Sequence, residues 1–265
     1  MDNKQIQKYI PLDKSWIIRM GVLDIINGYD DINKFLNKHK ALSDDLLALK
    51  RAVKFWSPTH NASANRRPSN KAINVGESGP LSRLLQVSSW KLNLNKKFIL
   101  RGTLKKRRIE NNSNIVNLSI KELLKLDGGT SQWATAAVLF GNNEKLERPP
   151  FKLRLTYEAV KNWKKQRAKN LVWKPRYDET ILHQAKTYLV LLRGRKIKFV
   201  PKQAEDYCFA RVFNFISEKE GEKKWPALHH HESDRIIEME KAMGNAKLRK
   251  PITSKDHRVV QAIVM

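Results

Sequence analysis

The chain has 265 residues, of which 41% are hydrophobic and 8% aromatic, and its 52 lysines and arginines against 26 acidic residues give a net charge of +26. This apolar content is typical of globular proteins and excludes a wholly disordered chain. No apolar run is long enough to cross a membrane, and the first residues lack the zones of a secretory signal, so we expect a soluble, cytoplasmic protein. The single cysteine, Cys208, excludes an internal disulfide framework and a metal site built from several cysteines.

The excess positive charge favours polyanionic partners, either nucleic acids or small ligands with several negative charges. The densest basic clusters lie at 105–108, 161–169 and 193–198. Nucleic-acid-binding modules usually combine such clusters with surface aromatic residues or with a helix that reads a groove. No module of that kind is recognisable, so nucleic acid stays an alternative partner that rests on charge alone.

In the first half of the chain, helices are predicted over 19–28 and 42–56. In the second of these, Ser43 is the expected N-cap, and Asp44 and Asp45 suit the positive end of the helix dipole. A strand, a glycine turn and an amphipathic helix are predicted within 72–92. A second strand follows at 97–102.

The second half continues this alternation of strands and helices. Helices are predicted over 119–126, 130–141, 205–217 and 233–244, the last ending at the C-cap glycine Gly244. A strand that runs into a basic helix is predicted over 151–167, and a hairpin over 187–200. Short strands that alternate with helices indicate an α/β or α+β fold.

Two stretches before predicted helices carry residues suited to bind anions. KSWIIR places Lys14, Ser15 and Arg19 at a helix start, where backbone N–H groups favour negative charge. VGESGPLSR places Gly79 before a helix that carries Arg83, and glycine lets a backbone approach a phosphate closely. By spacing alone, a solvated helix start and an ordinary turn remain open alternatives.

Polar residues also precede three later helices. Residues 130–132 offer two hydroxyls and an amide, which could simply cap the helix. Glu232 and Arg235 are three residues apart and so share a helix face, either as a site or as a surface ion pair. The consecutive histidines 229–231 cannot all reach one ion, so we expect no metal site there. Arg258 opens the last helix.

The order of these motifs resembles the EPSP synthase family, the 3-phosphoshikimate 1-carboxyvinyltransferases. The matching series is PxxKSxxxR, SDD, VGxxGxxxR, a basic segment, SQ before an apolar helix, LT before a helix, ESDRI and DHR. The most distinctive pair is ESDRI followed by DHR. The resemblance touches nearly the whole chain at low density.

The resemblance implies a fold and a reaction. The fold would be an α/β, inside-out barrel of βαβαββ units in two domains with a cleft between them, here 13–199 as the central domain and 1–12 plus 200–265 as a reduced second one. The reaction would move the enolpyruvyl group of phosphoenolpyruvate to shikimate 3-phosphate, in the shikimate pathway of aromatic amino acid biosynthesis. The family needs no cofactor or metal, and the two anionic substrates would be the partners.

The resemblance also implies site residues by matching position. Lys14 would contact the phosphoenolpyruvate phosphate and assist proton transfer, and Glu232 would be the acid–base carboxylate. Arginine suits carboxylates and phosphates because it binds them through two parallel hydrogen bonds. The residues implied in substrate binding are Ser15, Arg19, Gly79, Lys105, Arg107, Thr130, Ser131, Gln132, His231, Arg235 and Arg258.

Several positions depart from the family pattern. Glu77 stands where asparagine is usual, Pro80 replaces threonine, Phe151 replaces tyrosine, Gln203 replaces an acidic residue and His231 replaces lysine. The unit that carries the family's catalytic aspartate and the last strand–helix unit have no counterpart. Two alternatives therefore stay open: a catalytically silent relative that binds a small phosphorylated or carboxylated anion, and a basic protein that binds nucleic acid.

Overall fold

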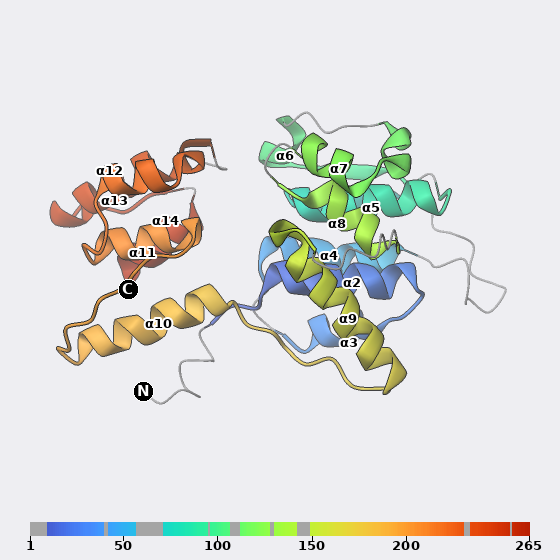
Figure 1. The fold of residues 1–265 in the computed structure, drawn as a ribbon, viewed down its shortest axis with the longest axis horizontal. Coiled ribbons are helices and arrows are strands. Elements are labelled where there is room, and N and C mark those ends of the chain that lie inside the picture. The colour runs from blue at the N-terminus through green and yellow to red at the C-terminus, as the bar shows by residue number, and fades with distance from the viewer. Residues whose placement is uncertain are drawn as a thin grey trace. The chain divides into compact units, whose positions relative to one another are not determined.

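The computed structural model describes residues 10–39, 42–56, 71–94, 96–106, 112–127, 130–141, 149–230, 234–254 and 256–265. The chain forms two compact units, shown in Figure 1. The large unit comprises Pro11–Arg176, and the C-terminal unit comprises Met1–Ile10 with Tyr177–Met265. The described residues are mostly helical, with one small two-stranded sheet, and none of their helices is both long and apolar enough to span a membrane.

The chain enters the large unit at 10/11 and leaves it at 176/177, whereas the resemblance implies boundaries at 12/13 and 199/200. The second boundary differs most. The difference arises from α10 (Glu179–Leu192), which packs within the C-terminal unit. Ile181 and Ala185 of this helix form a small apolar cluster with Ile10. Gln184 donates to the carboxylate of Asp206 over 3.1 Å, which ties α10 to the next segment.

In the large unit, α2 (Lys14–Ile26) is the central helix. Every residue from Met20 to Ile25 is buried, as expected for a helix with neighbours on all sides. The neighbours of α2 are α3 (Asp31–Asn37), α4 (Asp44–Phe55), α5 (Gly79–Lys91), α8 (Gln132–Leu139) and α9 (Arg154–Ala168).

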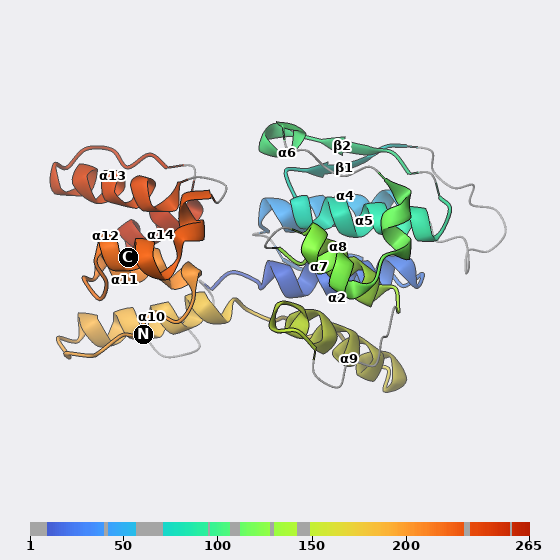
Figure 2. The ribbon, with the colours of Figure 1, turned by 45° about the horizontal axis from the view of Figure 1, so that its top comes forward.

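The sheet consists of β1 (Ile73–Gly76) and β2 (Phe98–Leu100) in parallel, with Ile73 opposite Phe98. Parallel strands need a crossover, and α5 lies between them in the chain. Figure 2 shows the two strands side by side, and β1 packs on α4. The unit is completed by α6 (Gly102–Lys106), η1 (Ser113–Asn117), α7 (Ile120–Leu126) and η2 (Phe151–Leu153).

The described part of the C-terminal unit is helical. Its core gathers Phe199, Tyr207, Phe209, Ile236 and Met239. After α10 its elements are η3 (Ala204–Asp206), α11 (Tyr207–Val212), α12 (Glu218–Lys224), η4 (Pro226–His230), α13 (Arg235–Lys247) and α14 (His257–Val264).

Two of the predicted strand regions are wrong. The predicted hairpin over 187–200 is replaced by α10, which continues to Leu192, and no strand follows it up to residue 203. Asp178 caps this helix through the N–H of Ile181. The strand predicted before the basic helix is the single turn η2, because Leu153, Thr156 and Ala159 are buried at helical spacing. The helix predicted to end at Gly244 continues to Lys247.

A glycine in the C-terminal unit marks a close contact. A Cβ added at Gly221 would lie 2.7 Å from Cδ2 of the fully buried Tyr207 ring and closer still to its Cε2. We expect Gly221→Ala to lower the free energy of unfolding by about 1–3 kcal/mol, the usual range for overpacking. Gly244→Ala is the matched control, because nothing lies within 4 Å of the added Cβ. Gly244→Ala should raise the free energy of unfolding by up to about 1 kcal/mol, because alanine has a higher helix propensity than glycine. Urea denaturation of both variants checks the contrast, and equal effects would contradict it.

Candidate anion-binding site

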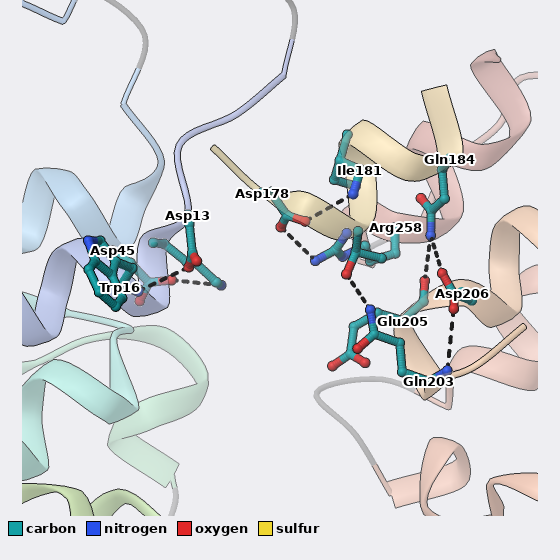
Figure 3. A network of polar contacts seen from close by, with 12 residues as sticks. Asp13, Trp16, Asp45, Asp178, Ile181, Gln184, Gln203, Glu205, Asp206 and Arg258 are labelled. Atoms are coloured by element: carbon teal, nitrogen blue, oxygen red, sulfur yellow. Dashed lines mark hydrogen bonds and ion pairs between the residues drawn. The ribbon is translucent and has the colours of Figure 1, made fainter. Parts of the chain in front are cut away.

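The start of α2 is fixed by Asp13. Its carboxylate accepts from the N–H of Trp16 at 3.0 Å, and its own N–H donates to the carbonyl of Arg176 at 2.9 Å. The Arg176 guanidinium pairs with Asp13 at 3.2 Å and lies 4.4 Å from the Trp16 ring centre. Figure 3 shows Asp13 beside Trp16. These contacts hold the first turn of α2, where Lys14 and Ser15 are exposed.

Lys14 makes an ion pair. Its Nζ lies 2.8 Å from Oδ2 of Asp45, which is in the first turn of α4. The Lys14 side chain is still 45% exposed, so a ligand can reach the ammonium group. Ser43 holds the N-cap position of α4, as predicted, but its side chain makes no capping hydrogen bond.

Arg19 lies one turn further along α2 and is partly buried. Its Nε donates to Oγ1 of Thr156 at 2.9 Å, and its Nη1 donates to the Ser15 carbonyl at 2.7 Å. Thr156 Oγ1 lies 3.0 Å from Thr135 Oγ1, so α2, α9 and α8 are linked. Within the described ranges, Arg19 thus bonds to neutral oxygens and makes no ion pair. Burial lowers the pKa of Arg19 to about 10, and the charge of Asp13 opposes this only in part.

The start of α8 is capped by an unexpected residue. The carboxylate of Asp127 accepts from the N–H groups of Gln132 and Ala134 at 2.9 and 3.2 Å and from that of Trp133 between them. Ser131 holds the N-cap position, but its hydroxyl donates to the Lys152 carbonyl at 3.2 Å instead. The capping role that the sequence left open for residues 130–132 therefore belongs to Asp127.

Gln132 is held by an arginine. Its Oε1 accepts a hydrogen bond from Nη1 of Arg83 on α5, and the Arg83 guanidinium lies 5.7 Å from the Trp133 ring centre. Gln132 and Thr135 are three residues apart and so share one face of α8. Arg19 and Arg83 are therefore both attached to that face, one through the threonine pair and the other through Gln132.

The structure also places three further predicted site residues of the large unit. Gly79 is buried at the start of α5, and Lys105 is exposed on α6. Thr130 is exposed and donates to Asp127 at 3.0 Å. Arg107 lies outside the described residues.

In the C-terminal unit, the two predicted arginines are paired with carboxylates. Arg235 is buried, and its Nε lies 2.7 Å from Oδ2 of Asp256. Arg258 contacts Asp178 at 3.3 Å, as Figure 3 shows. The predicted His231 and Glu232 lie outside the described residues.

His229 bonds to carboxylates rather than to a metal cluster. Its Nδ1 lies 2.8 Å from Asp234, and its Nε2 lies 3.5 Å from Glu222. The hydrogen bond to Asp234 raises the pKa of His229 most, and burial opposes it. Across the part of the chain that the structure describes, no group of three or more His, Cys, Asp or Glu side chains could hold a metal ion.

Comparisons of this chain with protein-family models, with curated proteins and with solved structures found no match.

Proposed function

We propose that the large unit binds a small, multiply charged anion of the shikimate 3-phosphate type, and that the chain acts as an EPSP synthase-like carboxyvinyltransferase. The observation that carries this proposal is Arg19. It is a partly buried guanidinium whose described hydrogen-bond partners are neutral oxygens, and the charge of Asp13 offsets its desolvation only in part. A cation that has lost water is costly without an opposite charge in direct contact, and a ligand carboxylate would supply that contact.

The surroundings of Arg19 suit such a ligand. Thr135 and Thr156 fix the guanidinium, which lowers the entropy cost of binding. Nη2 of Arg19 makes no hydrogen bond to the described residues, so it remains available to a carboxylate. Gln132, on the same face of α8 as Thr135, presents an amide held by Arg83.

The reaction follows from the resemblance. A ring hydroxyl of shikimate 3-phosphate would add to C2 of phosphoenolpyruvate while C3 gains a proton, and phosphate would then leave as the proton is removed again. Lys14 and Glu232 would move these protons. The βαβαββ barrel belongs to the same proposal; the βαβ element of the large unit is compatible with it.

A silent binder is the second candidate, and the ion pairs favour it. Arg235 and Arg258 bind Asp256 and Asp178, and Lys14 binds Asp45. Cations that already have carboxylate partners have less to gain from a substrate. These ion pairs are therefore what we expect of a protein that binds an anion through Arg19 but does not catalyse the transfer.

Isothermal titration calorimetry with shikimate 3-phosphate tests the binding. We expect Arg19→Lys to weaken binding about ten- to a hundredfold, because one charge-assisted hydrogen bond contributes about 1.5–3 kcal/mol. Arg51→Lys is the matched control, since Arg51 is exposed and its Nε bonds the Asn74 carbonyl. Equal affinity of the two variants, or no heat with the wild type, would overturn the site.

Release of phosphate from phosphoenolpyruvate separates the two candidates. The transferase predicts release that depends on shikimate 3-phosphate and is lost in Lys14→Ala and Glu232→Ala. Binding without release at high protein concentration supports the silent binder.

A further inference from the structure

The outer face of α9 carries a row of basic side chains that the proposed site does not use. The inner face of α9 packs on the core: it carries the buried Thr156 and Ala159 and the partly buried Trp163. Arg154, Lys161 and Lys165 lie seven and then four residues apart, so they share the opposite face, and Lys169 follows at the C-cap. All four are exposed. At 1.5 Å per residue the row is about 22 Å long. We call these four residues the basic row.

The charge of the basic row is hardly neutralised. Within the described ranges, none of its four members makes an ion pair. The single carboxylate on α9 is Glu158, which lies on the same face. Its Oε2 is 3.5 Å from Nη1 of Arg176, so it already has a cationic partner. The row is therefore a linear array of uncompensated positive charge in a chain whose net charge is +26.

An exposed aromatic ring lies at one end of the basic row. Phe151 is 82% exposed, and the Arg154 guanidinium lies 5.4 Å from its ring centre. A bare ring beside an arginine offers a surface on which a base can stack. Phosphate headgroups of lipids and acidic peptides would use the lysines but not this ring, so the ring favours nucleic acid among the polyanions.

We propose that the outer face of α9 binds single-stranded nucleic acid, with the phosphates along the basic row and one base stacked on Phe151. A positive groove or row that follows the backbone, combined with an aromatic platform, is how proteins bind single strands without reading sequence. The inference does not depend on the proposed transferase site, because none of its lysines contacts Arg19 or Gln132.

Fluorescence anisotropy of a labelled oligothymidylate at several salt concentrations tests the proposal with the full chain. The variant Lys161→Gln/Lys165→Gln/Lys169→Gln removes three charges from the row. For a single strand, the slope of log K against log salt changes by about 0.7 per phosphate contact, so we expect the slope to fall by about 2. The affinity at about 0.1 M salt should fall roughly a hundredfold.

The control is Lys54→Gln/Lys121→Gln/Lys125→Gln, three exposed lysines elsewhere in the large unit. It removes the same charge and should change affinity much less. Equal losses in the two triple variants would overturn the proposal, since only net charge would then matter. The row variant should keep the urea denaturation midpoint of the wild type, followed by tryptophan fluorescence, which shows that it is folded.

Phe151→Ala identifies the class of partner. We expect it to weaken oligothymidylate binding roughly tenfold while the salt slope stays the same, because stacking releases no counterions. Unchanged affinity in Phe151→Ala would overturn the single-strand assignment. Tighter binding to a duplex, or to vesicles of anionic phospholipid, would do the same.

Discussion

Replacement of Arg167 by methionine is expected to lower the free energy of unfolding of the large unit by about 3–5 kcal/mol at neutral pH, the usual cost of leaving a buried charge without its partner. The carboxylate of Asp24 is fully buried in α2, and Arg167 on α9 pairs with it. Trp163 Nε1 donates to the same carboxylate at 2.7 Å, and the Ile32 N–H at 3.0 Å. These two neutral donors remain in the variant, but the opposite charge does not.

The loss should depend on pH. Burial raises the pKa of Asp24, and the hydrogen bond from Trp163 and the charge of Arg167 oppose this. Without Arg167 the pKa rises further. A folded-state pKa above the unfolded value means that the folded protein gains stability as pH falls through that pKa. The variant should therefore be destabilised more at about pH 8 than at about pH 5, because a lower pH favours the uncharged form of Asp24.

Urea denaturation followed by tryptophan fluorescence measures this effect, because six of the seven tryptophans lie in the large unit and only Trp225 lies in the other. Arg51→Met, on an exposed arginine, is the control and should cost little. In an Asp24→Asn background, Arg167→Met should cost much less than in the wild type, since no buried charge is left. Equal losses at both pH values and in both backgrounds would contradict the explanation.

Local signals in the sequence predicted most of the helices. Capping and apolar spacing located α4, α5, α7 and α8, and the two short strands were also found. The sequence failed where β-branched and aromatic residues suggested strands. In 187–200 the stretch TYLVLL has strand-like composition, yet Ile181 and Ala185 extend its apolar face upstream at helical spacing. Because this face is buried against Ile10, the segment forms a helix despite its strand-like composition.

The role of the candidate site stays a prediction, but its contacts can be compared with the sequence. Arg19 and Gln132 were proposed from motif order, and the structure attaches both to α8. Thr135 and Thr156 were missed because their hydroxyls act only through a contact between helices. Asp127 was missed because two residues separate it from the TSQ motif that it caps. The Asp24–Arg167 pair spans 143 residues, and such a separation leaves no local pattern.

A second large effect is expected in the C-terminal unit, where Arg235→Met should cost about 3–5 kcal/mol at neutral pH. Arg235 and Asp256 are both more than nine-tenths buried, and Nε lies 2.7 Å from Oδ2. Asp256 also accepts from the Arg258 N–H at 2.9 Å, at the start of α14. Loss of Arg235 therefore leaves a buried carboxylate at the junction of α13 and α14.

Asp256 responds to pH in the opposite sense from Asp24. Burial raises its pKa, but the hydrogen bond and charge of Arg235, with the Arg258 N–H and the charge of His257, outweigh burial and lower the pKa overall. A lowered pKa contributes stability that is present above the unfolded value and is lost as pH falls through the folded value. The wild-type unit should thus lose stability below about pH 4 through Asp256, and Arg235→Met should remove most of that acid sensitivity.

Cys208 reports on this unit directly. It is the only cysteine of the chain and is 2% exposed, and burial raises its pKa to about 12. A thiol reagent therefore reacts only when the unit opens, at a rate set by the opening free energy. A loss of 3–5 kcal/mol corresponds to acceleration of a hundredfold or more. Arg195→Met, on an exposed arginine of the same unit, should leave the rate unchanged.

The variant Arg235→Met also distinguishes two roles of Arg235, pairing with Asp256 and binding a substrate carboxylate. If its main role is the pair with Asp256, Arg235→Met accelerates labelling of Cys208, and the double variant Arg235→Met/Asp256→Asn recovers most of the loss because the buried charge is gone. If Arg235 serves chiefly to hold a substrate carboxylate, as the resemblance implies, labelling stays slow while binding of phosphoenolpyruvate is lost. The 2.7 Å contact with a buried carboxylate leads us to expect the first result.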